Sequence, residues 1–163
     1  MRQHLIGASA TLALVFAVAA CGGSTPSASS TTPAATCVNQ SAPHHAYVVV
    51  QHLSGASIQG CVGFTGDTID AATLMDESRV EYQTQTFSFG KAVCQVDNEP
   101  AQFTQCLPQD APYWDLFIES AGAWTVASTG YTQVTLHDKE AIGWRYVQSS
   151  DPSPSPPPLA KEG

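Results

Sequence analysis

The alternation of apolar and polar side chains is most regular over residues 113–127. Trp114 and Leu116 lie on the same side of an alternating run, and a period of two predicts a strand with one face in a core. Gly122 then supplies a turn, and Trp124 begins a returning segment. These residues therefore predict a β-hairpin, and we expect the rest of the sheet to be organised around it.

Other segments repeat this pattern, and one departs from it. Further strands are predicted at residues 47–53, 58–64, 80–86, 92–96, 132–136 and 142–147. Between the second and third of these, Ala71, Leu74 and Met75 have helical spacing, and Asp67 resembles a helix N-cap. Residues 101–112 have little pattern and are expected to form a loop. The fold class is therefore α+β: a mixed or antiparallel sheet of hairpins crossed by one short helix, close to a β-grasp.

Residues 1–20 have the pattern of an export signal. A weakly basic start is followed by an apolar run over 5–20, which is short for a membrane-spanning helix. Val18-Ala19-Ala20 before Cys21 resembles the lipobox of bacterial lipoproteins. This resemblance implies cleavage before Cys21 and diacylation of its thiol, which would anchor the protein to the outer face of a bacterial membrane. The alternative is an ordinary signal peptide cut near the same alanines, which leaves Cys21 free.

Two segments of biased composition enclose the domain. Residues 21–36 are rich in Gly, Ser, Thr and Ala, and are expected to form a linker that cannot bury a core. The folded domain is expected at 37–147. Residues 148–163 contain five prolines and predict an extended, solvated and disordered tail. The alternative for this tail is a segment that spans the cell wall or binds a partner.

The net charge of the chain limits the classes of molecule that it could bind. The chain has 6 Lys and Arg against 14 Asp and Glu, a formal charge of −8. Such acidity argues against nucleic acid or anionic lipid as a partner, because no basic patch is available to neutralise phosphate. The membrane would be reached through the lipid anchor instead.

The cysteine count indicates disulfides. If Cys21 is acylated, four cysteines remain, and an even number in an exported domain predicts two disulfides. Three pairings are possible. We prefer Cys94–Cys106, which closes a loop after its strand, and hence Cys37–Cys61, which ties the start of the domain to its second strand.

Motifs for metal binding or catalysis are scarce. A metal site would combine cysteines with His44, His45 or His52, but no two cysteines have zinc-like spacing. The sequence lacks the Gly-x-Ser-x-Gly, His-Glu-x-x-His and Cys-x-x-Cys patterns and a phosphate-binding glycine loop. We therefore expect neither a metal site nor an enzyme.

A series of motifs in chain order resembles the transcobalamin C-terminal-like domain, a domain of unknown function in many secreted and anchored bacterial proteins. The resemblance covers about residues 45–147. It rests on Cys61, Leu74-Met75, Val93-Cys94, Tyr113-Trp114, Trp124, Gly130-Tyr131 and 142–146. In cobalamin carriers the related domain covers one face of the corrinoid, so the resemblance implies a corrinoid-like ligand as one candidate, with no cofactor required.

Four aromatic residues are candidates for contact with a ligand. Tyr113, Phe117, Trp124 and Tyr131 are hard to bury together in so small a domain, and exposed aromatic rings favour ring-shaped ligands. We expect Trp114 in the core and Trp124 partly exposed near Tyr131, in the wall of a groove. The predicted function is a membrane-anchored extracytoplasmic binding module for a small organic ligand. The alternatives are an accessory lipoprotein that docks to a transporter or other envelope protein, and a hydrolase of unknown type.

Overall fold

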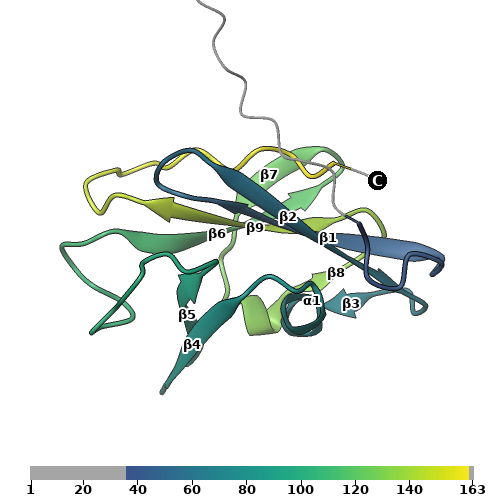
Figure 1. Ribbon diagram of the computed structural model, residues 1–163, viewed down its shortest axis with the longest axis horizontal. Coiled ribbons are helices and arrows are strands. Elements are labelled where there is room, and N and C mark those ends of the chain that lie inside the picture. The colour runs from purple at the N-terminus through teal and green to yellow at the C-terminus, as the bar shows by residue number, and fades with distance from the viewer. Residues whose placement is uncertain (1–35, 162–163) are drawn as a thin grey trace, which may run out of the picture.

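The computed structural model describes residues 36–161 (Figure 1). Its elements are β1 (His44–Gln51), β2 (Ser57–Phe64), β3 (Ile69–Asp70), α1 (Ala71–Glu77), β4 (Tyr82–Phe87), β5 (Gly90–Val96), β6 (Tyr113–Ser120), β7 (Ala123–Val126), the 3-10 helix η1 (Tyr131–Gln133), β8 (Thr135–Leu136) and β9 (Ala141–Val147). The export signal and Cys21 lie outside the described residues, so their assignments remain predictions. Within the described range, no helix is long and apolar enough to cross a membrane.

Five strands form one mixed sheet in the order β2-β1-β9-β6-β7. Neighbouring strands are antiparallel except β1 and β9, which run parallel with Val48 opposite Ile142. The first and last strands of the domain are therefore central neighbours, as in a β-grasp. The prediction of an α+β domain with a mixed sheet of hairpins and one short helix is confirmed.

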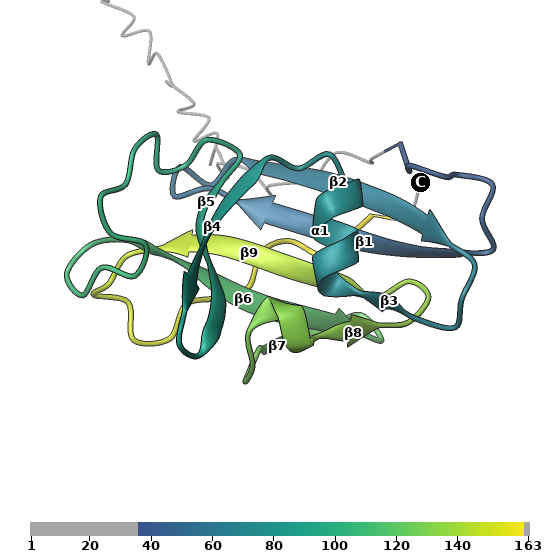
Figure 2. The same cartoon turned by 90° about the horizontal axis from the view of Figure 1, so that it is seen from below.

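One face of the sheet, called here the inner face, packs against the remaining elements. Helix α1 and the β4–β5 hairpin cross the strands on this side, together with η1 (Figure 2). The inner face contributes Val48, Trp114 and Trp144 to the main core, where they meet Leu74 and Met75 of α1. Side chains alternate between the two faces of a strand. This packing therefore requires every second residue of each strand, the one that points to the inner face, to be apolar.

The helix begins later than the sequence suggests. Asp67 was expected to cap it, but α1 starts at Ala71, and its N-cap residue Asp70 makes no capping hydrogen bond from its side chain. The two preceding residues form β3, which pairs with β8 so that Ile69 lies opposite Leu136. Burial of Ile69 and Leu136 in the core thus takes precedence over the capping pattern at Asp67. The predicted helical face is correct, since Ala71, Leu74 and Met75 are all buried.

The opposite face, called here the outer face, is covered by the C-terminal segment. In Figure 1 this segment, coloured yellow, runs over the sheet on the side away from α1. It has no helix or strand over 148–161. Its contacts nevertheless differ from those of a solvated tail, because Pro157 is buried and the Lys161 backbone bonds to Gln59. The sequence showed the extended character of the tail but not the apolar surface beneath it.

Both predicted disulfides are present. Cys37 is bonded to Cys61, and Cys94 to Cys106, so the preferred pairing is confirmed. The first ties the start of the domain to β2 on the outer face. The second closes the loop between β5 and β6, which forms the entrance of the cavities described next.

Candidate functional site

A cleft lies between the β4–β5 hairpin and the edge of the sheet at β6. It has a volume of about 260 Å³. One wall comes from the start of β5, a second from the loop before η1, and the floor from β6 and β9. The lining residues include Phe89, Lys91, Val93, Leu107, Trp114, Asp115, Leu116, Tyr131 and Trp144. We call this site the hairpin cleft.

The floor of the hairpin cleft is aromatic and held rigidly. The rings of Tyr131 and Trp144 meet edge to face, with centroids 6.0 Å apart. The indole N–H of Trp144 points to the sulfur of Met75 at 3.3 Å. The indole N–H of Trp114 donates to the backbone oxygen of Glu99 at 2.8 Å. These partners hold the two indoles in place, and because Tyr131, Trp144 and Trp114 are only 3%, 4% and 8% exposed, ring edges rather than ring faces line the cleft.

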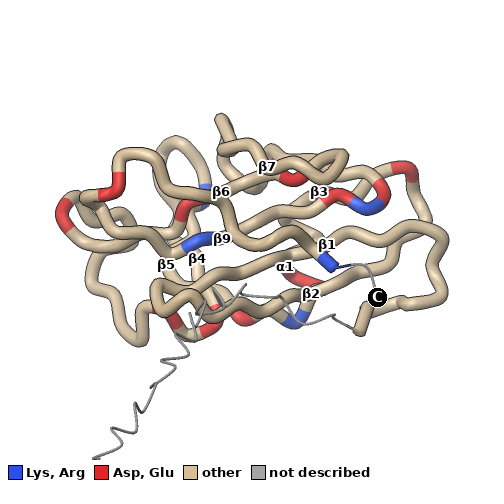
Figure 3. The backbone as a smooth tube through the Cα atoms, turned by 90° about the horizontal axis from the view of Figure 1, so that it is seen from above, with Lys and Arg blue, Asp and Glu red and all other residues tan. Residues whose placement is uncertain are grey.

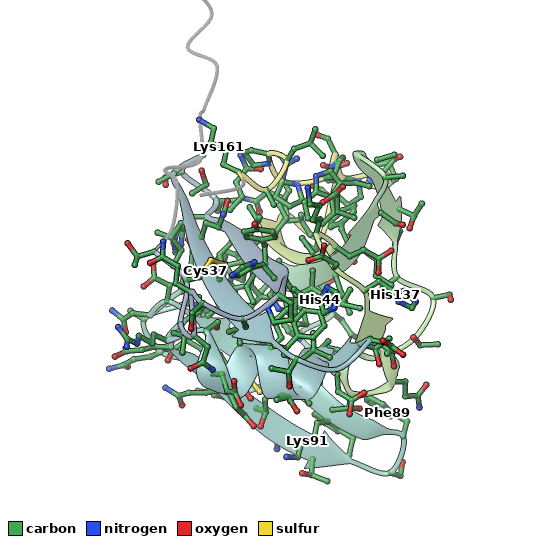
Figure 4. The ribbon with its side chains drawn as sticks, turned by 90° about the vertical axis from the view of Figure 1, so that its right-hand side faces the viewer. Cys37, His44, Phe89, Lys91, His137 and Lys161 are labelled. Atoms are coloured by element: carbon green, nitrogen blue, oxygen red, sulfur yellow. A yellow bond between two sulfur atoms is a disulfide. The ribbon has the colours of Figure 1, made fainter. Side chains whose placement is uncertain are left out.

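The rim of the cleft exposes apolar side chains. Phe89 is 67% exposed, and Leu107 is 41% exposed. Phe89 stacks on Phe87, with ring centroids 5.1 Å and planes 7° apart, so the tip of the hairpin holds its aromatic ring in place. Figure 4 shows Phe89 and Lys91 on this hairpin, far from Lys161 on the opposite side of the molecule. Exposed apolar groups beside a cleft indicate a surface that contacts another molecule.

Asp115 lies between Trp114 and Leu116 in β6, so strand alternation directs its side chain to the outer face, away from the cleft, where Arg145 of β9 is the residue opposite it. Burial raises the pKa of the Asp115 carboxyl, and the backbone N–H of Leu116, which donates to it at 3.1 Å, opposes that increase. The Lys91 side chain on the hairpin is exposed and supplies a positive charge to the lining of the cleft.

A second cavity of about 340 Å³ adjoins the Cys94–Cys106 disulfide. It is lined by the loop over 100–112 and by Tyr113, Trp114 and Tyr146. Trp114 thus borders both cavities and packs on Tyr146 with ring centroids 4.9 Å apart. The lining of this cavity comes mainly from loop residues, so the hairpin cleft is the more rigid of the two sites.

The four aromatic residues expected to contact a ligand do not meet in one groove. Tyr131 is buried in the main core with 3% exposure, on the inner face. Phe117 is 1% exposed, and Trp124 packs with Tyr47 and Ala141 on the outer face. The expectation that Trp124 lies near Tyr131 is wrong, because Trp124 pairs with Glu119 and therefore shares the outer face of β6.

Two of the four nevertheless border cavities. Tyr131 contributes to the floor of the hairpin cleft, and Tyr113 is half-buried at the cavity beside Cys106. Trp114 is buried with 8% exposure, as predicted. The sequence analysis missed the hairpin residues Phe89 and Lys91. Two phenylalanines around the turn of a predicted hairpin were the available signal, because a turn exposed to solvent has no need of aromatic side chains.

The histidines form local contacts. His52 contacts the carboxylates of Glu99 at 2.8 Å and Asp97 at 3.0 Å, through its two ring nitrogens. His44 lies 3.8 Å from Asp138. Across residues 36–161, no three His, Cys, Asp or Glu side chains are arranged to hold a metal ion. Lys and Arg residues lie at separate points along the backbone over this range (Figure 3).

Comparisons with known proteins do not assign this chain to a family. No family model matches the chain, and no curated protein matches it. One similar solved structure is a protein from Ruminococcus gnavus ATCC 29149, determined at 1.30 Å, whose description proposes metal binding. It has 16% sequence identity and a TM-score of 0.45 over 64% of this chain and 97% of that one. A likeness of this size carries no inference about function.

Proposed function

We propose that this protein is a membrane-anchored extracytoplasmic binding module that takes a small organic ligand in the hairpin cleft. The observation that supports this best is the pairing of an aromatic floor with an exposed, ring-stacked Phe89 at the rim. The Phe89 side chain is 67% exposed, and an exposed aromatic ring lowers the solubility of a domain. A role of Phe89 in binding explains why the ring is present at this position. The proposed role is recognition without catalysis.

The size of the cleft limits the ligand. Drug-sized ligands occupy pockets of roughly 300–1,000 Å³, and the hairpin cleft has about 260 Å³. It therefore suits one ring with short substituents, or one ring-sized group of a larger molecule. A corrinoid would have to lie across the mouth of the cleft, against Phe89 and Leu107, rather than inside it.

Two features support a place outside the cytoplasm. The sequence pattern of residues 1–20 predicts an export signal. Two disulfides suit an oxidising environment.

The test uses the indole N–H signals of the three tryptophans in an NMR titration of the mature protein. The probes are tyramine, its uncharged analogue 4-ethylphenol, and cyanocobalamin. We expect tyramine to shift the signals of Trp114 and Trp144, which line the cleft, and to leave Trp124 on the outer face unchanged. 4-Ethylphenol tests whether the amine contributes, since equal binding of the two probes would show that the cleft recognises the ring alone.

Two variants complete this test. Phe89→Ala should weaken tyramine binding about fivefold, the equivalent of roughly 1 kcal/mol of aromatic contact. Val126→Ala is the matched control, since Val126 is also exposed, at 60%, but lies on β7 and does not line the cleft. If none of the three probes shifts Trp114 or Trp144 at millimolar concentration, the small-ligand proposal fails. The exposed rim would then favour docking to an envelope protein.

A further inference from the structure

The outer face of the sheet carries aromatic side chains that the strands themselves leave uncovered. Tyr47, Phe117 and Trp124 all lie on this side, around Gly143 in the middle of β9. Tyr47 and Phe117 are nearly completely buried, at 4% and 1% exposure. The cover comes from the C-terminal segment, which crosses the face after β9 ends (Figure 1).

Two polar side chains of the sheet hold the backbone of this segment. Arg145 donates to the backbone oxygen of Ser155, to its hydroxyl at 2.8 Å and to the backbone oxygen of Pro156 at 3.5 Å. The amide of Gln59 donates to the Lys161 oxygen at 2.7 Å and accepts from the Lys161 N–H at 2.8 Å. The segment therefore joins the sheet through side chains and not as a sixth strand.

Between these two points a proline ring enters the aromatic surface. Pro157 is buried, whereas Leu159 is 48% exposed. A Cβ atom at Gly143 would lie 2.6 Å from the Pro157 ring and 2.8 Å from the Trp124 ring, so only glycine leaves room for both. The missing side chain at Gly143 creates a slot that both the Pro157 ring and the Trp124 ring enter.

These features match a known mode of peptide recognition. Proline-rich segments bind in grooves lined by aromatic rings, with their backbone carbonyls held by polar side chains. Their prolines fix the backbone before binding, so little conformational entropy is lost. Trp124, Gly143, Arg145 and Gln59 supply the aromatic wall, the slot and the polar contacts on this domain.

One donor in the groove has no partner. The indole N–H of Trp124 is buried and makes no hydrogen bond among the described residues. A buried donor without a partner is unfavourable, because it has given up its hydrogen bond to water. The tail therefore fits the groove incompletely, and a proline-rich segment with a carbonyl at this position would fit it better.

We propose that the outer face is a binding groove for extended, proline-rich peptide segments, and that the protein's own tail, Ser155–Lys161, occupies it as a releasable intramolecular ligand. The short connection from Val147 keeps the tail at a high effective concentration, of the order of millimolar. A weak contact thus suffices to close the groove until the tail is displaced. This groove is independent of the hairpin cleft, which lies on the other side of the sheet.

The test uses the mature full-length protein and a fluorescent peptide that copies residues 151–163. Pro157→Asp should release the tail, because it places a charge against Trp124, and should thereby open the groove to the peptide. Leu159→Asp is the matched control, since the same charge is added at an exposed position. We expect fluorescence anisotropy to show at least tenfold tighter peptide binding by Pro157→Asp than by Leu159→Asp or the unaltered protein.

Adding Arg145→Ala to Pro157→Asp should abolish peptide binding, because the Arg145 side chain holds two backbone carbonyls of the segment. If Pro157→Asp stays folded by near-ultraviolet circular dichroism and binds no peptide, the proposal is overturned.

A second measurement covers the outcome in which Pro157→Asp does not fold. Hydrogen exchange in the unaltered protein should show the Lys161 amide opening far more often than the amides of β1 and β9. If the Lys161 amide is protected as strongly as those of the central strands, the tail belongs to the cooperative fold. It is then no releasable ligand, and the proposal fails.

Discussion

Trp114 of β6 joins the sheet to the loop that contains Glu99, and its replacement tests how much these contacts stabilise the domain. Its indole is 8% exposed, packs on Tyr146 and donates to the Glu99 oxygen at 2.8 Å. Deletion of a buried tryptophan side chain typically costs about 3–5 kcal/mol. Because Trp114 borders two cavities open to solvent, water can enter the vacated space. We therefore expect Trp114→Ala to cost about 3 kcal/mol, at the lower end of that range.

The milder variant separates packing from hydrogen bonding. Trp114→Phe keeps a six-membered ring on Tyr146 and removes the rest of the indole with its N–H donor. The Glu99 oxygen also accepts from the backbone N–H of Val96 at 3.0 Å, so it is not left without a partner. The expected cost is then one hydrogen bond plus the lost indole contacts, about 2 kcal/mol.

Urea denaturation of the oxidised protein, followed by circular dichroism, measures both values through the midpoint at constant slope. Val126→Ala, at an exposed position on β7, serves as the control and should change the free energy of unfolding by less than about 0.5 kcal/mol. Equal losses in Trp114→Phe and Trp114→Ala would refute the reasoning, because the hydrogen bond and not ring packing would then dominate.

Three further predictions concern charge, the anchor and the disulfide. Asp115→Asn should stabilise the protein at pH 7, by less than about 1 kcal/mol at this partly exposed site. The folded-state pKa of Asp115 is raised, so stability is lost as pH rises through it, and the gain should vanish below about pH 4 in thermal melts, where the carboxyl is protonated in both states. Cys21→Ala should move the protein from the detergent phase to the aqueous phase in detergent partitioning, and continued detergent association would contradict a lipid on this thiol. Replacing Cys94 and Cys106 together by alanine should lower the free energy of unfolding by about 3 kcal/mol in urea, as expected for closure of a short loop; no loss would show that the loop between β5 and β6 is ordered without the bond.

Local pattern was sufficient to predict several parts of this protein. The period of two located the strand around Trp114 and Leu116, and the turn at Gly122 has a positive φ of 78°, as a tight turn requires. Helical spacing identified the buried face of α1. The even number of cysteines and their positions relative to the strands predicted both disulfides. Each of these features depends on residues close in sequence or on simple counting.

The candidate site required information that alternation does not carry. A period of two says that Trp114 and Trp124 each lie on one face of a strand, but the register of the hairpin decides whether they share it. The β6–β7 pairing sets Trp124 opposite Glu119 and so places it on the outer face, away from Tyr131. The proposed aromatic groove failed for this reason, while the hairpin cleft arose where the β4–β5 hairpin folds back onto β6.

The sequence by itself determined the α+β class, most of the strands and the helical face, because each follows from the stereochemistry of neighbouring residues, and it favoured one cysteine pairing among three. The strand expected at 132–136 is instead η1 followed by the two-residue β8. Only the tertiary structure decided that β1 and β9 lie side by side, and that the loop before η1 reaches the β4–β5 hairpin. It also decided that Pro157 enters a slot at Gly143. These contacts join residues far apart in the chain. They form because the apolar faces of the sheet must be covered, and the segment that covers each face depends on the packing of the whole domain.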